Sequence, residues 1–150
     1  MKNIKKTKLN NSKKIIIILC IVAFVIFISV IFSIINIGNN KIYPNIKVQG
    51  LSVYGKEQEE VNTELNKIYN EKKLAGIKLK QGEYETTISF DQLGVSANIG
   101  DAVTEAYAIG RSGNIITNNY NIFLRYFIPK DIEINFTIDE NSIDKVIEDV

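Results

Sequence analysis

The chain has 150 residues with no histidine and one cysteine, which excludes the usual zinc sites, catalytic triads and an internal disulfide. Residues 1–14 carry six lysines and no acid, whereas residues 38–150 carry 12 basic and 17 acidic side chains, a net charge of −5. An acidic domain lacks the cationic face that a phosphate backbone requires, so we exclude nucleic acid as a partner. We also expect neither a metal nor a cofactor.

Residues 15–37 predict a membrane-spanning helix that contacts the lipid bilayer. All 23 positions are uncharged and 18 are Ile, Leu, Val or Phe; as a helix they would be about 35 Å long, enough for a hydrocarbon core of about 30 Å. The lysines before this segment place the N terminus in the cytoplasm and the remaining residues outside. A cleaved signal peptide is the main alternative, but residues 34–37 (IINI) lack the small residues of a cleavage site. Lipid attachment at Cys20 is disfavoured because large residues precede it.

The first half of the outer part predicts a strand, a helix and a hairpin. Residues 46–49 alternate apolar and polar side chains, as a half-buried strand does. Residues 57–74 predict a helix, because apolar residues recur every three or four positions and glutamates occupy the first turn. Residues 77–80 and 84–90 alternate again on either side of a glycine turn, which predicts a β-hairpin with one buried side.

The second half predicts two helices and a strand. Asn98 is a suitable N-cap for a helix that Gly110 ends. Residues 116–127 continue with helical spacing until Pro129 stops them. We interpret the apolar positions of this second helix as core, namely Ile116, Tyr120, Phe123 and Phe127. Residues 131–138 alternate without interruption and are the clearest strand in the chain.

The last segment predicts an unfinished helix. Ser142 is a suitable N-cap, and the apolar positions after it have helical spacing, but barely two turns precede the last residue. We therefore expect the outer domain to be incomplete. The predicted organisation is a cytoplasmic Lys-rich tail (1–14), a transmembrane helix (15–37), a spacer (38–44) and an extracytoplasmic domain (45–150).

Three motifs occur in order in the outer part. Residues 42–61 hold the opening strand, the step Val48-Gln49-Gly50-Leu51 and an acidic helix start; residues 90–95 hold Leu93-Gly94-Val95; and residues 106–114 fit A-x-x-x-G-R-x-G-N. Together they resemble the peptidoglycan-binding domain that precedes VanW-family and L,D-transpeptidase (YkuD-type) domains in Gram-positive bacteria, with Val61 where that family usually has alanine. The resemblance covers residues 42–150 and implies a cell-wall binding module. The catalytic domains usual downstream do not occur in this sequence, so no enzymatic role carries over.

Four residues are candidates for ligand binding. Arg111 could bind a carboxylate of a peptide stem through its forked guanidinium, and Tyr107 or Tyr120 could offer a flat surface to a sugar ring. Asn114 completes the motif. The alternative, which we favour, is structural: Gly110 closes the helix, Arg111 neutralises its negative end, and the Gly-Asn pair turns the chain.

Catalysis is not predicted. Residues 142–145 fit the S-x-x-K motif of penicillin-interacting enzymes, but the S-D-N and K-T-G partners of that motif are missing. Ser142 also has a structural role as a helix cap. We therefore expect a protein that is not an enzyme.

These observations predict an α+β fold: one N-terminal transmembrane helix, then a small, mostly antiparallel sheet covered by helices on one face. Three functions stay open. The first is a membrane-anchored, non-catalytic module that binds peptidoglycan and positions itself or a missing C-terminal domain. The second is an envelope domain that binds another protein without glycan affinity, and the third is a truncated remnant of a VanW-like or L,D-transpeptidase wall protein.

Overall fold

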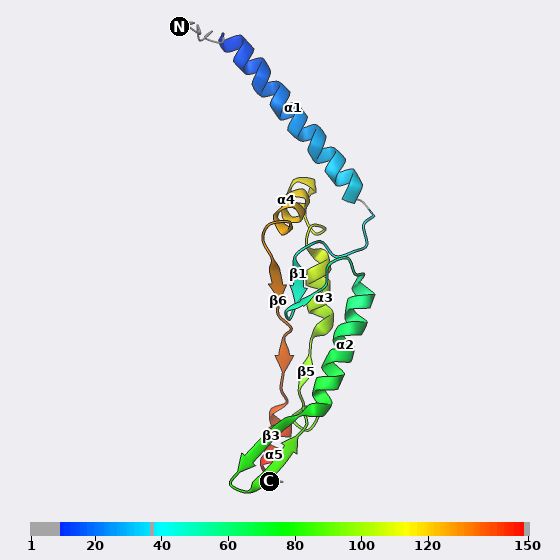
Figure 1. Ribbon diagram of the computed structural model, residues 1–150, viewed down its shortest axis with the longest axis vertical. Helices are drawn as coiled ribbons and strands as arrows, with labels where there is room; N and C mark the ends of the chain where they lie inside the picture. Colours follow the sequence, from blue (N-terminus) through cyan, green and yellow to red (C-terminus); the bar gives the residue numbers. More distant parts are fainter. Residues whose placement is uncertain (1–9, 37, 149–150) are drawn as a thin grey trace, which may run out of the picture. The chain divides into compact units, whose positions relative to one another are not determined.

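The structure is a computed structural model that describes residues 10–36 and 38–148. The chain divides into two compact units, Met1–Asn39 and Asn40–Val150. The described part of the first unit is dominated by helix α1 (Asn11–Asn36) (Figure 1). This helix is long and apolar enough to cross a membrane, and its most apolar stretch is not buried inside the protein. A helix at this position is therefore confirmed; residues 1–9 and 37 of the predicted tail and span lie outside the described residues.

The second unit is a mixture of short strands and helices, which confirms the predicted α+β class. Its elements are β1 (Ile46–Val48), β2 (Leu51–Ser52), α2 (Gln58–Ala75), β3 (Ile77–Gln81), β4 (Tyr84–Ile88), β5 (Ser96–Ala97), α3 (Ile99–Ala108), α4 (Ile115–Arg125), β6 (Lys130–Ile132), β7 (Phe136–Thr137) and α5 (Glu140–Glu148).

Strand pairing within the described residues is distributed over three small sheets. In the first, β1 is central, antiparallel to β2 and parallel to β6, with Val48 opposite Ile132. The other two are antiparallel pairs, β3 with β4 and β5 with β7. The turn between β1 and β2 is Gln49-Gly50, and both residues have positive φ (49° and 78°). This is the type I′ geometry that two-residue hairpins favour, and it explains the glycine of the first motif.

The core lies where α3 packs against β1, β6 and α2. Burial of these apolar side chains is the main force that holds the unit together, at about 1.5–3 kcal/mol for each large side chain. Val103 and Ala106 of α3 are fully buried, as the helical spacing predicts. The other core side chains are Ile42, Tyr43, Ile46, Val48, Val53, Val61, Leu65, Ile88, Ile99, Ala102, Ile122 and Ile132.

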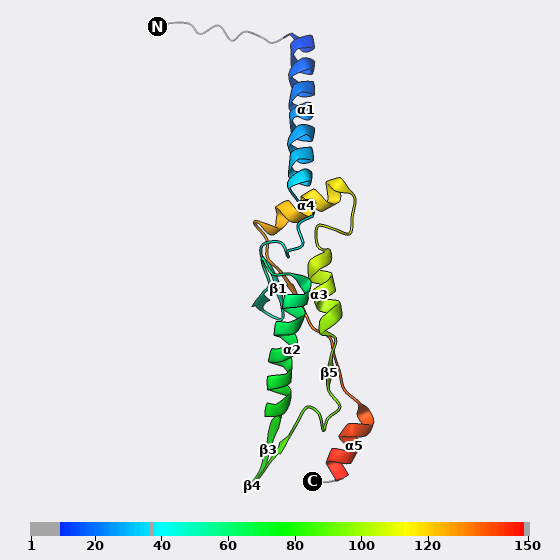
Figure 2. The ribbon, with the colours of Figure 1, turned by 90° about the vertical axis from the view of Figure 1, so that its right-hand side faces the viewer.

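The hairpin forms where the sequence predicts it, but the side that was expected to be buried is mostly exposed. Ile77, Leu79 and Tyr84 are exposed, and Ile88 is the buried residue at its base. The hairpin lies at the end of the second unit opposite α4 (Figures 1 and 2). It therefore extends past the sheet against which the prediction expected it to pack.

The apolar face of α4 is a second correction. Its spacing is helical as predicted, yet Ile116, Tyr120, Phe123 and Phe127 are between 58% and 79% exposed. Ile122, on the opposite side of α4, is the residue of this helix that enters the core. The interpretation of these residues as core is wrong, because periodicity shows that a face is apolar but not what covers it.

Two local predictions near the C terminus also change. The expected continuous strand over residues 131–138 is divided, because β6 pairs with β1 and β7 pairs with β5. Helix α5 begins at Glu140 rather than after Ser142. The Asp139 carboxylate stands at the cap instead, accepting hydrogen bonds from the Asn141 N–H (3.3 Å) and the Ser142 hydroxyl (2.7 Å).

Candidate functional site

The segment with the A-x-x-x-G-R-x-G-N motif connects α3 to α4. Gly110 follows the end of α3 with φ at 77°, a conformation that side chains disfavour. A Cβ at this position would also lie 2.5 Å from Cγ1 of Ile122 and 3.0 Å from Cε2 of Tyr43. Only glycine satisfies both the turn and this close approach, so the motif's first glycine has a structural reason.

Arg111 lies between two aromatic rings. Its guanidinium carbon is 4.4 Å from the ring centroid of Tyr43 and 4.1 Å from that of Tyr107. Nη1 donates to the backbone carbonyl of Tyr107, and Nη2 donates to that of Lys41, each at 2.7 Å. Burial raises the pKa of the Tyr43 hydroxyl above its ordinary value, an effect that the nearby Arg111 charge opposes. The arginine thus joins the last turn of α3 to the start of the second unit.

The other two candidate residues have different surroundings. Asn114 is the N-cap of α4, where its side-chain oxygen accepts a hydrogen bond from the Thr117 N–H at 2.9 Å. Tyr120 lies on the exposed face of α4. The structure therefore brings Arg111 and Tyr107 together, places Asn114 in the adjoining turn, and leaves Tyr120 on another surface. Ligand binding by these four residues stays a prediction.

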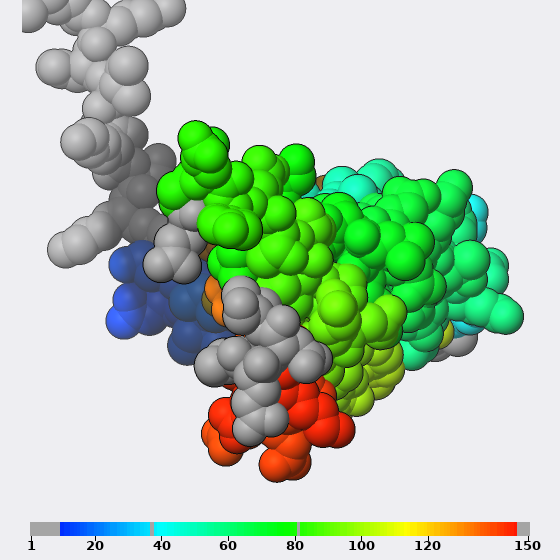
Figure 3. Space-filling view, turned by 90° about the horizontal axis from the view of Figure 1, so that it is seen from below, coloured from blue at the N-terminus to red at the C-terminus, as the bar shows by residue number. Residues whose placement is uncertain are grey.

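An apolar groove lies elsewhere in the second unit, with a volume of about 650 Å³. Helix α2 contributes Ile68 and Tyr69 to it, and the loop before β5 contributes Phe90 and Leu93. The remaining lining residues are Gln49, Gly50, Leu51, Leu65, Lys72, Ile77, Val95, Ala97, Ile99, Ile134, Phe136 and Ile138. Figure 3 looks onto the end of the unit that carries the hairpin (green) and α5 (red).

The groove was missed by sequence reasoning because its walls come from segments far apart in the chain. One signal did exist. Ile134, Phe136 and Ile138 alternate with polar residues, so they share a face, and that face lines the groove. The sequence could not show that α2 and the loop after β4 lie across from it.

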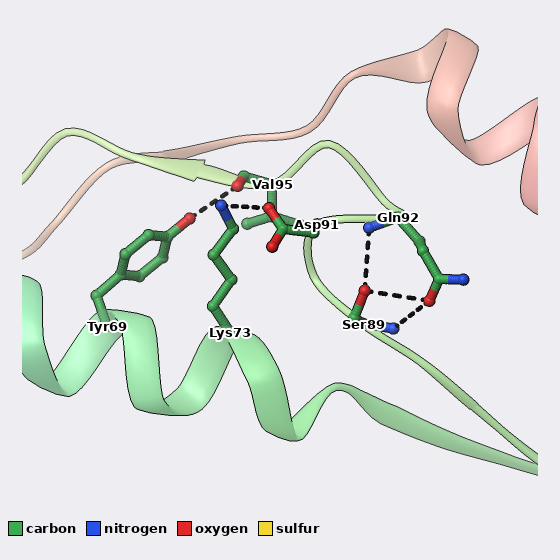
Figure 4. Close-up of polar contacts among 6 residues, drawn as sticks. All are labelled: Tyr69, Lys73, Ser89, Asp91, Gln92 and Val95. Atoms are coloured by element: carbon green, nitrogen blue, oxygen red, sulfur yellow. Dashed lines mark hydrogen bonds and ion pairs between the residues drawn. The ribbon is translucent and has the colours of Figure 1, made fainter.

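Polar contacts hold the loop before β5 against α2 (Figure 4). The Tyr69 hydroxyl donates to the carbonyl of Val95 at 2.7 Å. Lys73 forms an ion pair with Asp91. The hydrogen bond between the two side chains raises the pKa of the Lys73 ammonium. Ser89 and Gln92 exchange hydrogen bonds within the same loop. The contacts of Tyr69 and Lys73 thus fix this wall of the groove to α2.

The chemistry of the groove is that of a binding surface. Its lining is mostly aliphatic and aromatic, with Lys72 and Gln49 as polar members. Among the described residues, no group of three or more His, Cys, Asp or Glu side chains could hold a metal ion. A small α+β domain with an open apolar groove has the form of a ligand-binding module.

The comparison with known families indicates which kind of ligand-binding module the second unit resembles. Residues 86–150 match the model of the family described as "Putative peptidoglycan binding domain". The resemblance expected from the sequence is thus confirmed for this segment, which contains the second and third motifs, the loop before β5, and Ile134, Phe136 and Ile138 of the groove. The first motif and α1 precede it. No curated protein and no solved structure matches the chain.

Proposed function

We propose that this chain is a membrane-anchored, non-catalytic module that binds peptidoglycan on the outer face of the cytoplasmic membrane. The family match over residues 86–150 carries the proposal. Helix α1 supports the anchoring, because its length and composition suit a membrane span. Six lysines precede the apolar run of α1 and no acid accompanies them, which favours a cytoplasmic N terminus.

The groove is the site we propose for the ligand. Half of its wall, including Phe90, Leu93 and Phe136, comes from the segment that matches the family model. The exposed ring of Phe136 can stack on the apolar face of a sugar, and the aliphatic lining suits the alanine methyl groups of a peptide stem. Lys72, which also lines the groove, can pair with a stem carboxylate.

The Arg111 cluster is the alternative site. Two of the guanidinium N–H groups already donate to carbonyls of Tyr107 and Lys41. A carboxylate there would have to use the remaining N–H groups of the guanidinium or compete with these two contacts. The cluster stays a candidate through Tyr107, whose ring contacts the guanidinium and is half-buried.

Co-sedimentation with insoluble peptidoglycan tests the proposal. The full chain in detergent should sediment with purified sacculi well above an unrelated acidic membrane protein. Phe136→Ser should raise the dissociation constant for peptidoglycan about tenfold, which corresponds to about 1.4 kcal/mol. Tyr84→Ser is the matched control, because both rings are exposed (51% and 85%) but only Phe136 lines the groove. Equal recovery of the full chain and the unrelated protein would rule out wall binding.

A second candidate function is binding to another envelope protein, and the hairpin favours it. Ile77, Leu79 and Tyr84 are exposed on one face of β3–β4. Exposed apolar strand faces and edges are common protein contacts. Crosslinking in cells from a photoreactive residue at Leu79, together with failure to sediment with sacculi, would support this function over wall binding.

A further inference from the structure

Helix α4 and the turn that follows it carry an exposed apolar face, which we call the α4 apolar face; it consists of Ile116, Tyr120, Phe123 and Phe127. These side chains recur at intervals of three or four residues; the first three lie on one side of α4, and Phe127 lies in the turn two residues past its end. All four are more than half exposed, and the rings of Phe123 and Phe127 contact each other with centroids 5.1 Å apart. A contiguous exposed patch of this kind marks a docking surface.

Helix α4 lies beside the residues with which the second unit begins. Asn45 donates from Nδ2 to the carbonyl of Arg125 at 2.9 Å, and the Lys130 N–H donates to the carbonyl of Asn45 at 2.9 Å. Both views show α4 and the β3–β4 hairpin at opposite ends of the second unit (Figures 1 and 2). The α4 apolar face is therefore at the end where the chain enters this unit.

Chain length limits the distance between the end of α1 and the first residues of the second unit. Helix α1 ends at Asn36, and Lys41 is already held in the second unit by the hydrogen bond from Arg111. Five residues of fully extended chain reach at most about 18 Å. This limit follows from covalent geometry alone. The chain therefore allows Lys41 to lie at most about 18 Å from the last residue of α1.

Acidic and basic residues are also segregated along the chain of the second unit. All 17 acids lie in residues 57–105 and 131–150. Residues 38–56, which enter the second unit, carry three lysines and no acid, and residues 106–130, which include α4, carry Arg111, Arg125 and Lys130 and no acid. Anionic headgroups attract basic segments and repel acidic ones. The segments that enter the second unit and that include α4 are therefore the parts of this net-acidic domain that an anionic membrane would not repel.

We propose that α4 lies on the outer leaflet of the membrane in which α1 is anchored, with its apolar face in the headgroup region. The chemistry fits, because Tyr and Phe rings at the interface keep an apolar body in lipid and, for Tyr, a hydroxyl in water. Amphipathic helices of this kind lie in the interface plane. The inference rests on the proposed anchoring. The interfacial position of α4 would keep this end of the second unit on the lipid and direct the opposite end toward the wall.

A single tryptophan can report the position of α4, because the chain has none of its own. The full chain carrying Phe123→Trp is reconstituted into phosphatidylglycerol–phosphatidylethanolamine vesicles with or without brominated acyl chains. Bromine should quench the emission at least about twofold, since an interfacial ring reaches the acyl boundary. The matched control is Tyr84→Trp, at the far hairpin, which should be unaffected by bromine.

A second set of variants tests the face itself. Tyr120→Asp and Phe127→Asp, each added to Phe123→Trp, should abolish most of the quenching while the protein still floats with the vesicles through α1. Circular dichroism should show that these variants are folded, as expected for substitutions at exposed positions.

The outcomes separate the proposals. Flotation with vesicles but no quenching of Phe123→Trp would overturn the interfacial position of α4 and leave the anchoring intact. Failure to float would overturn both. An emission change of Phe123→Trp on addition of soluble peptidoglycan fragments, without quenching by brominated lipid, would show that the α4 apolar face is a glycan platform instead.

Discussion

The guanidinium of Arg111 donates a hydrogen bond to the backbone carbonyl of Lys41, across 70 positions of sequence, at 2.7 Å. This contact holds the first residues of the second unit against the turn between α3 and α4. The glycine and arginine of the third motif thus have local structural roles: the glycine turns the chain, and the arginine joins it to residue 41. Binding and folding roles for Arg111 can be separated by experiment.

Arg111→Lys should destabilise the second unit by about 1–2 kcal/mol. An ammonium cannot donate to two separated carbonyls in the same planar arrangement or stack as well between two rings. Chemical denaturation of the full chain in detergent measures the change. Arg125→Lys is the matched control, with an expected effect below about 0.5 kcal/mol. An Arg111→Lys variant of unchanged stability that no longer sediments with peptidoglycan would indicate a direct role in binding.

Gly110→Ala should be more destabilising than Gly55→Ala. Both glycines have similar positive φ (77° and 75°), but only the Cβ at position 110 would meet a neighbour, Cγ1 of Ile122 at 2.5 Å. Left-handed backbone strain alone costs about 1–2 kcal/mol, and overpacking adds about 1–3 kcal/mol. The difference between the two variants in free energy of unfolding therefore measures the close approach. Equal losses would contradict the packing shown at Gly110.

The stability of α5 should depend on pH in the acid range. The hydrogen bond from the Ser142 hydroxyl lowers the pKa of the Asp139 carboxyl below its ordinary value of 3.8. A lowered pKa in the folded state means that the ionised form is stabilised, so this contribution is complete above pH 3.8 and is lost as the pH falls through the folded value. An NMR titration of the Asp139 carboxyl carbon, with amide exchange in α5, measures both effects.

Ser142→Ala gives the control for this titration. Removing the hydroxyl should return the pKa of Asp139 toward 3.8, since the hydrogen bond is the largest cause of the shift. Fraying of α5 should then begin at higher pH than in the unsubstituted chain. A pKa that does not move on this substitution would show that the cap contact is not formed in solution.

The direction of the proposed anchor can be tested by cysteine labelling. In a Cys20→Ser background, Ser112→Cys places a thiol at an exposed position of the second unit. A membrane-impermeant maleimide should label it in intact cells, because the positive-inside rule puts this unit outside. Lys5→Cys, on the other side of the span, should be labelled only after the membrane is opened. The reverse pattern would invert the topology.

Much of the local structure was predictable because it depends on near neighbours in the chain. The apolar run predicts α1, and the helical spacing predicts α2. Asn98 caps α3 as predicted, and the structure shows that it does so by accepting a hydrogen bond from the Asp101 N–H. Gly110 ends α3 for a reason visible in the motif. Such features follow from backbone conformation and spacing, and both are written in a few consecutive residues.

Tertiary structure alone decided which apolar faces are covered. The hairpin and α4 have the alternation and spacing of buried elements, yet Tyr84 and Phe123 are exposed, whereas Ile122 on the reverse of α4 is buried. The same holds for residues 131–138, which alternate as one strand but pair with two different partners. Periodicity fixes the sides of an element relative to each other, and burial depends on contacts between distant segments.

The same distinction between sequence and tertiary structure applies to the candidate site. The sequence by itself determined a helix long and apolar enough to cross a membrane, an acidic domain after it, and the motifs that resemble a peptidoglycan-binding family. Only the tertiary structure decided that Arg111 is held between Tyr43 and Tyr107, and that α2 and the segment through Phe136 enclose a groove. A groove is a property of surfaces brought together by folding, and no single stretch of residues contains it.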